Sequence, residues 1–264
     1  MRGARYWSRR ARALVVRRYR RLQTPTLAEG ALTFDVISRR CVGFGVEIGP
    51  GDRPECVRYR APGQTVVVDR WPDLEAWAEY GMTVGARADA AHLPFANGAF
   101  DYLISAHCLE HCPDVLSALA EWRRVLKDGG ALVLVLPHVD RSFDRGRPVA
   151  TYDHHAAEHG KGGDGLDDEH WIDFEAFSIP NHQPTWLDDE GAHRADGSLD
   201  REYLAAQGFV HFHAWTQNEM VEILLRSGFH IRDVAEELPQ RPNSFLIAAS
   251  VARDEDARGS SRRI

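Results

Sequence analysis

The sequence predicts an α/β fold in which helices cover both faces of a mostly parallel sheet. Apolar runs of strand length alternate with helical stretches between residues 42 and 137, as in βαβ proteins. The first run, Val42–Ile48, leads into Gly49-Pro50-Gly51, a glycine-rich turn typical of nucleotide-binding units. The next run, Thr65–Asp69, ends in an acid about 20 residues beyond that turn, where such units hold a ribose.

The other elements follow in the same alternation. Strands are predicted near Thr83–Ala88 and at Phe100–Ser105, Ala131–Leu136, Phe229–Leu238 and Ser244–Val251. Helices are predicted at 28–40, Pro72–Tyr80, Pro113–Lys127 (closed by Asp128-Gly129-Gly130) and Gln217–Ser227, which Thr216 caps. The short separation of the last two strands, by Pro239–Asn243, predicts an antiparallel pair.

The chain divides into five predicted parts. They are a basic N-terminal helix or tail (1–24), a core (25–137), an insertion (138–213), the C-terminal part of the core (214–253) and a disordered tail (254–264). The insertion holds 16 acids, six bases and nine of the 13 histidines. So long an interruption of a regular fold is either disordered or builds a site, as a lid does.

Charge and cysteine content limit the function. Residues 1–21 contain nine arginines and no acid, which leaves 23 basic against 39 acidic residues in the rest of the chain. This excess of acidic residues outside the basic segment disfavours nucleic-acid binding. The basic segment is read either as a contact with an anionic membrane surface or a partner, or as a solvated terminus. Four cysteines without a Cys-x-x-Cys pair disfavour zinc and, with no secretory leader, predict a cytoplasmic protein.

The glycine turn and Asp69 alone leave two nucleotide cofactors open, because dinucleotide dehydrogenases use the same pair. Only two lysines occur, Lys127 and Lys161, and neither follows a tyrosine by four positions, so the short-chain dehydrogenase proton relay is absent.

Four segments, taken in chain order, distinguish between these two cofactors. They are Glu47-Ile48-Gly49-Pro50-Gly51, Ala88-Asp89-Ala90-Ala91-His92-Leu93-Pro94-Phe95, Ala106-His107-Cys108-Leu109-Glu110-His111 and Arg124-Val125-Leu126-Lys127-Asp128-Gly129-Gly130. Together they resemble the class I S-adenosylmethionine-dependent methyltransferases of the type 11 kind. The resemblance implies a Rossmann-like, seven-stranded sheet in the order 3-2-1-4-5-7-6, with the insertion after strand five.

The resemblance also implies roles for individual residues. Gly49, Pro50 and Gly51 would lie along the methionine part of S-adenosylmethionine, whose amino group Glu47 would help to hold. Asp69, next to Arg70, would take the ribose hydroxyls. Asp89 would bind the adenine amine, Ala90 would lie beside the ring, and His107 would line the sulfonium end. Arg53 stands where many members have a third glycine.

The insertion is expected to select the acceptor. The run from Pro137 to Pro148, the patch Asp168-Glu169-His170-Trp171 and His211-Phe212-His213 resemble, more loosely, methyltransferases of bacterial polysaccharide assembly. This implies O-methylation of a sugar, and more narrowly the methylmannose-polysaccharide type. A hydroxyl acceptor needs a base, for which His154 is the first candidate and His155 and His170 the next, or a metal.

Oxygen ligands for Mg²⁺ are available at Asp167, Asp168 and Glu169. Acceptor contacts are predicted for Tyr152, Trp171, His211 and His213, because sugars bind to polar groups and aromatic faces. The predicted partners are a small-molecule or oligosaccharide acceptor and, in a homodimer, a second copy. The alternatives are another small-molecule or lipid-linked acceptor, methylated at oxygen or nitrogen, and a cofactor-binding scaffold without activity.

Overall fold

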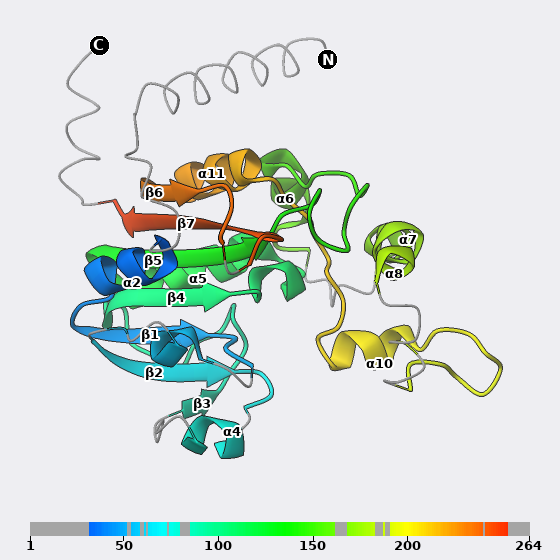
Figure 1. Cartoon of the computed structure of the whole chain (residues 1–264), viewed down its shortest axis with the longest axis horizontal. Coiled ribbons are helices and arrows are strands. Elements are labelled where there is room, and N and C mark those ends of the chain that lie inside the picture. Colours follow the sequence, from blue (N-terminus) through cyan, green and yellow to red (C-terminus); the bar gives the residue numbers. More distant parts are fainter. Residues whose placement is uncertain are drawn as a thin grey trace, which may run out of the picture.

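A seven-stranded sheet forms the centre of the computed structural model, which describes residues 32–51, 54–58, 61, 63–72, 74–79, 85–161, 168–182, 187, 191–239 and 241–252. The strand order is β3-β2-β1-β4-β5-β7-β6, as predicted. In that order the strands are Gly85–Arg87, Gln64–Asp69, Phe44–Ile48, Phe100–Ala106, Leu126–Pro137, Ser244–Val251 and Phe229–Ala235. Strand β7 runs antiparallel to both β5 and β6, and the other pairs are parallel (Figure 1).

Two apolar layers bury the faces of this sheet. Because side chains alternate along a strand, Leu132 and Leu134 of β5 join one layer and Val133 joins the other. The first layer packs against helices α5 (Val115–Val125) and α11 (Gln217–Arg226). The second packs against α2 (Leu32–Arg40), α3 (Glu55–Arg58) and α4 (Leu74–Glu79). The predicted alternation of strands and helices is therefore confirmed.

The boundary between α5 and β5 differs from the prediction. Helix α5 begins after Asp114, whose carboxylate accepts a hydrogen bond from the Ser117 amide (2.8 Å). Strand β5 begins at Leu126, opposite Phe100, and a register shift follows. The Asp-Gly-Gly segment thus lies within the strand rather than ending the helix, and Gly129 absorbs the irregularity with a φ of 73°.

The insertion is folded in the part that the structure describes, and it lies beyond the carboxyl ends of the parallel strands (Figure 1). Its elements are α6 (Tyr152–Glu158), α7 (Asp168–Asp173), a π-helical turn η2 (Phe174–Ser178), α8 (Ile179–Asn181) and α10 (Arg201–Ala206). Helix α6 packs against α5 and α11, and the other elements contribute to a small apolar cluster formed by Trp171, Phe174, Ala192, Leu204, Val210 and Phe212.

The C-terminal part of the core returns to the predicted pattern. Thr216 is the N-cap of α11, but its hydroxyl donates to the Glu219 carboxylate instead of capping the backbone. Strands β6 and β7 form the expected antiparallel pair. None of the described helices is long and apolar enough to cross a bilayer. The predicted basic segment 1–24 and tail 254–264 lie outside the described residues.

Candidate functional site

A cavity of about 630 Å³ opens at the carboxyl ends of β1, β2 and β4. Parallel α/β sheets bind ligands at this edge, where the crossover connections diverge. Its lining residues are Ile48, Gly49, Gly51, Asp69, Arg70, Trp71, Ala88, Asp89, Ala90, Ala91, His92, His107, Cys108, His111, Cys112, Pro113, Asp114, Ser117, Gly160, Gln207 and Gly208. Of the nine predicted cofactor residues, seven line this cavity, which we call the donor cavity. The other two are Glu47 and Pro50.

The glycine turn brings bare backbone to the wall of the donor cavity. Gly49 and Gly51 have φ angles of 68° and 56°, which side-chain-bearing residues rarely adopt. A Cβ on Gly49 would collide with the Cys108 side chain, whereas one on Gly51 would meet no atom of the described residues within 4 Å. Gly51 therefore faces open space that a ligand can fill.

Glu47 supports this turn from beneath. Its side chain is completely buried, and its two carboxylate oxygens accept hydrogen bonds from the amides of Glu55 (2.6 Å) and Cys56 (2.8 Å). Burial raises the pKa of Glu47 to about 7, against the effect of these hydrogen bonds. Glu47 thus fixes the start of α3, and it is not among the residues that line the cavity.

Two acids stand at the ends of neighbouring strands. Asp69, the last residue of β2, accepts from the amides of Gly51 (3.1 Å) and Trp71 (2.8 Å). Asp89 accepts from the Ala91 amide (2.9 Å), and its other oxygen lies 3.8 Å from the Arg70 guanidinium. These bonds fix both carboxylates at the cavity wall and leave oxygen lone pairs for a ligand.

His107 follows β4 in a strained conformation. It is the one non-glycine residue with a positive φ (52°) among the described residues, and such strain is common at functional sites. Its Nε2 lies 2.8 Å from the Ser244 hydroxyl, and Nδ1 lies 3.4 Å from the Glu110 carboxylate. Burial, and secondarily Arg241, lowers the pKa of His107 to about 4.

His111 is a second histidine of the cavity wall. Its Nδ1 lies 2.9 Å from the Val210 carbonyl, so Nδ1 donates and Nε2 keeps its lone pair. Burial lowers the pKa of His111 to about 3, and the ring is therefore neutral at physiological pH. No role is predicted for His111 from the sequence, because its place in the wall depends on Val210, 99 positions away.

A buried ion-pair network lies behind His111. The His211 ring is 4.7 Å from the His111 ring, and its Nδ1 lies 2.6 Å from an Asp144 oxygen. Asp144 also contacts Arg147 (3.2 Å) and accepts from Ser178 (2.7 Å). Although burial opposes it, His211 with the other partners holds the Asp144 pKa well below its usual range. Arg147 also donates to the backbone carbonyls of His211 and Phe212, and so anchors this segment.

Comparisons with known proteins identify the fold that carries this cavity. Residues 46–134 match the family model described as a methyltransferase domain. An S-adenosylmethionine-dependent methyltransferase from Mesorhizobium loti superposes on 83% of this chain and 95% of its own, with a TM-score of 0.51 at 19% identity. The fold is that of the class I methyltransferases. The chain also superposes on the [4+2]-cyclase SpnF (TM-score 0.50, 14% identity, 84% of this chain and 80% of that one).

Curated relatives match shorter stretches of this methyltransferase fold. The demethylmenaquinone methyltransferase of Thermus thermophilus is 39% identical over 94 residues, which cover 33% of this chain and 43% of that protein. Ajmaline N-methyltransferase of Rauvolfia serpentina is 42% identical over 55 residues, covering 21% and 19%. The chain thus spans less than half the length of these relatives.

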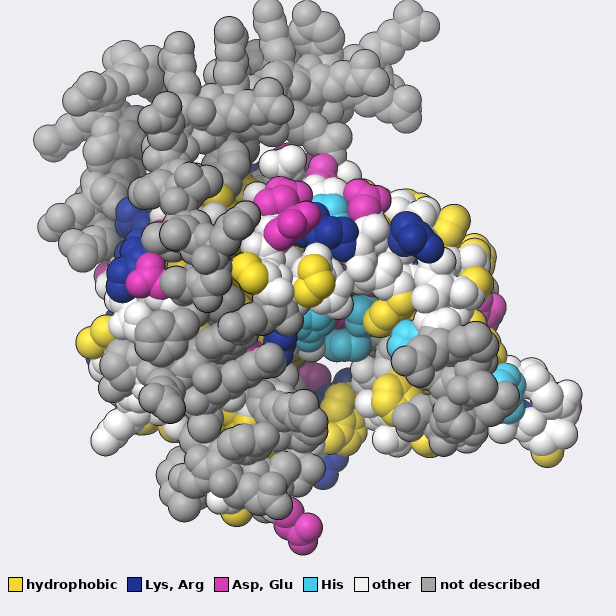
Figure 2. All heavy atoms as spheres, in the orientation of Figure 1, with side chains coloured by type: hydrophobic (Ala, Val, Ile, Leu, Met, Phe, Trp, Pro, Cys, Tyr) yellow, Lys and Arg dark blue, Asp and Glu magenta, His cyan; other side chains and the backbone are white. Residues whose placement is uncertain are grey.

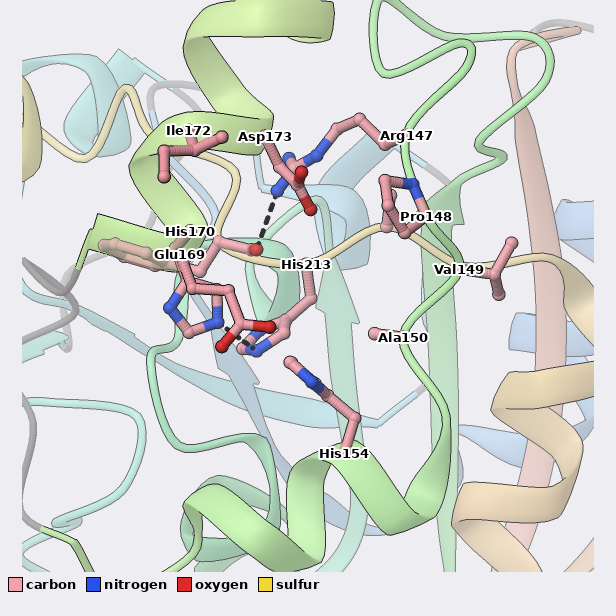
Figure 3. Close-up of a pocket in the computed structure, with 12 residues that line it drawn as sticks. Arg147, Pro148, Val149, Ala150, His154, Glu169, His170, Ile172, Asp173 and His213 are labelled. Carbon is pink, nitrogen blue, oxygen red and sulfur yellow. Dashed lines mark hydrogen bonds between the residues drawn. The ribbon is translucent and has the colours of Figure 1, made fainter.

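A second cavity, of about 400 Å³, lies within the insertion. Figure 2 shows histidine side chains gathered around a hollow on the face of the molecule that it draws, and Figure 3 shows the lining of the cavity. The lining residues are Arg147, Pro148, Val149, Ala150, His154, Glu169, His170, Ile172, Asp173, Phe212, His213 and Ala214. We call this the insertion cavity.

The three predicted bases are divided by their surroundings. His154 and His170 line the insertion cavity. His155 is buried, and its Nε2 accepts a hydrogen bond from the Trp215 indole (3.1 Å). Burial, with neighbouring histidines, holds the His155 pKa well below its usual value. None of the three is among the residues that line the donor cavity.

The residues predicted to contact the acceptor and a metal do not come together in one site. Trp171 is fully buried in the apolar cluster of the insertion, so its ring offers no face to a sugar. Tyr152 is half-buried under the Arg226 guanidinium, 3.5 Å from its ring centre. Of the proposed Mg²⁺ ligands, Asp167 lies outside the described residues, Asp168 begins α7, and only Glu169 has a described side chain, which is exposed in the insertion cavity.

Proposed function

We propose that this chain is an S-adenosylmethionine-dependent O-methyltransferase that acts on a saccharide or glycosylated metabolite. The observation that carries the proposal is the donor cavity, whose wall presents Gly49, Gly51, Asp69, Asp89 and His107 from consecutive connections of the sheet. The resemblance assigns these residues, in this order, to the methyl donor.

The residues present fit this cofactor. When bound, S-adenosylmethionine supplies an activated methyl group. The Asp69 carboxylate would take the ribose hydroxyls, since the loop amides hold it in place. Asp89 would take the adenine amine, with Ala90 beside the ring; the Trp122 indole fixes that loop by donating to the Ala90 carbonyl (3.0 Å). The open space in front of Gly51 suits the amino-acid part.

For the proton of the acceptor hydroxyl we favour His111 over the histidines of the insertion cavity. The Nδ1–H of His111 is fixed by the Val210 carbonyl, and its Nε2 keeps the lone pair that accepts a proton. It also lines the cavity in which the donor is proposed to bind. His154 and His170, which the sequence predicts as bases, line the insertion cavity instead.

The saccharide acceptor is supported by the polar lining of the insertion cavity, which includes Arg147, His154, Glu169 and Asp173. The burial of Trp171 removes one expected aromatic contact. A second candidate, methylation of a quinone-like, lipid-linked or amine acceptor, is favoured by the names of the relatives that match parts of the chain. The basic segment at residues 1–21 would then serve membrane access.

The decisive experiment is donor binding by calorimetry, followed by labelled-methyl transfer. Asp69→Asn keeps the side-chain volume but removes the charge, and should weaken donor binding about 10- to 100-fold. Asp101→Asn is the matched control at the opposite end of the sheet, and should change affinity by less than about twofold. Equal affinities in wild type and Asp69→Asn would place the donor elsewhere.

The transfer assay separates the acceptors. The full chain is incubated with methyl-labelled donor and a panel of mono- and oligosaccharides, a quinol and an amine, with and without EDTA. Label in a saccharide supports the first proposal, and label only in the quinol or amine supports the second. Donor binding without any transfer favours a catalytically silent scaffold. Loss of transfer in EDTA, restored by Mg²⁺, would support the predicted magnesium requirement.

A further inference from the structure

Four metal-ligating side chains converge at the edge of the insertion cavity. His154 and Glu158 lie one turn apart on α6, His170 lies on α7, and His213 lies on the segment between α10 and α11. One ligand atom from each lies within 4.8 Å of the ligand atoms of the other three. Figure 3 shows the rings of His154, His170 and His213 directed toward one another from these three segments.

The distances suit ligands of one ion. The Glu158 carboxylate lies 2.9 Å from His154 Nε2, 3.0 Å from His170 Nε2 and 3.1 Å from His213 Nε2. The Nε2 atoms of His170 and His213 are 3.0 Å apart. In a tetrahedral zinc site with bonds of about 2.0–2.1 Å, neighbouring ligand atoms are about 3.3 Å apart. The four distances above are each a few tenths of an ångström shorter than this separation, and no two of the four ligand atoms are more than 4.8 Å apart.

Protons alone satisfy this arrangement poorly. A neutral imidazole has one N–H, so His170 and His213 can both donate to Glu158 only if both Nε2 atoms carry hydrogen. Those two hydrogens would then face each other across 3.0 Å. A cation at the centre instead accepts the lone pairs of all three nitrogens and pairs with the carboxylate.

The donor set identifies the class of ion. Three imidazoles and one carboxylate suit zinc and the neighbouring divalent transition metals, whereas Mg²⁺ and Ca²⁺ prefer oxygen ligands. His170 and His213 are buried, which shields the ion, and the insertion cavity gives it a path of entry. We propose that His154, Glu158, His170 and His213 form a binding site for a divalent transition metal, of which zinc is the best fit.

The site has a structural consequence that is independent of the proposed methyl transfer. The metal ties α6, α7 and the 210–216 segment together, although they are far apart in the sequence. Helix α6 also ends near Gly160, which lines the donor cavity and donates to Asp114 (3.2 Å). Metal binding therefore holds the C-terminal end of α6, and with it Gly160, in place beside the donor cavity. The cysteine pattern could not reveal this site because none of its ligands is a thiol.

The test uses the full-length chain without an affinity tag, stripped with a chelator and titrated with zinc chloride. We expect one zinc per chain by elemental analysis after gel filtration, and a higher melting temperature. Cobalt(II), added to the stripped protein in place of zinc, should give the intense visible bands of tetrahedral coordination. These measurements are made on the wild-type chain, so their outcome does not depend on whether a substitution impairs folding.

Two variants localise the ion. Glu158→Gln keeps the shape of the side chain but removes its charge. Glu158→Gln and His213→Asn should each weaken zinc binding at least about 100-fold. His159→Asn is the matched control, since His159 adjoins Glu158 but contacts Asp114 (3.2 Å). It should bind zinc as the wild type does. Glu110, His111 and His211 also lie within ligand distance of one another. The proposal is overturned if wild type retains no more zinc than Glu158→Gln, if His111→Asn rather than His213→Asn loses the ion, or if cobalt gives only weak octahedral bands.

Discussion

The sheet and the insertion are stabilised in different ways. Within the sheet, alternate side chains of β5 enter two continuous apolar layers, and the acids at its edge are held by backbone amides of nearby loops. The insertion has one small apolar cluster, and buried charged and polar groups such as Asp144, Arg147 and His213 tie its segments together. Such networks specify one arrangement only when every member is paired, so the insertion depends more on individual polar residues than the sheet does.

The largest expected effect compares two fully buried tryptophans, one in each region. Trp122→Ala and Trp171→Ala should each cost about 3–5 kcal/mol of local stability, measured by denaturation and hydrogen exchange. Trp122 packs in the sheet core and donates to the Ala90 carbonyl, so its loss should also abolish donor binding. Trp171 packs in the insertion cluster, so Trp171→Ala should loosen the insertion and leave donor binding within about tenfold. Equal losses of donor binding would show that the two regions fold as one unit.

The next effect concerns which region supplies the base. His111→Asn keeps a donor for the Val210 carbonyl but removes the Nε2 lone pair, and should lower kcat about 10²- to 10³-fold. Because the pKa of His111 is lowered to about 3, the wild-type rate should not depend on its protonation above pH 5. His154→Ala should instead raise KM for the acceptor. The reverse result, with kcat lost only in His154→Ala, would assign the base to the insertion as the sequence predicted.

A smaller effect tests the buried carboxyl at the boundary between the regions. Both Glu110 oxygens are buried without a hydrogen bond, and burial raises the Glu110 pKa from 4.5 to about 7. Because the folded state holds this proton more tightly, the contribution of Glu110 to stability is fully present below its unfolded-state pKa and is lost as the pH rises through 7. Glu110→Gln removes that dependence and should be more stable than wild type by about 3 kcal/mol at pH 8, but not at pH 4.5. Parallel urea curves at both pH values measure the difference. If the difference in unfolding free energy between variant and wild type is the same at both pH values, Glu110 stays ionised.

The same contrast explains what the sequence could predict. The Gly49 turn, Asp69 and the alternation of Leu132 with Val133 depend on neighbours within about one βαβ unit, so local patterns find them. His211 and Asp144 are 67 residues apart, and His170 and His213 are 43 apart. Nothing local shows that such side chains meet. The sequence predicts Trp171 as an acceptor contact because an aromatic residue beside acidic residues gives the same pattern whether it faces a ligand or packs in a core.

The smallest expected effect concerns a surface carboxylate of the sheet. Asp101 lies 2.7 Å from Lys127 Nζ and accepts from the Phe44 amide (2.9 Å). The lysine, and next the amide, hold the pKa of Asp101 below its usual range. Such a carboxylate stabilises the fold above its unfolded-state pKa and loses this contribution as the pH falls through its folded-state pKa. Both side chains are more than one third exposed, so water and salt screen the pair, and Asp101→Asn should cost at most about 1 kcal/mol at pH 7. Urea denaturation at low and high salt should show the cost shrinking with salt. A larger, salt-independent loss would mean that the bond to Phe44, rather than the ion pair, holds β1 against β4.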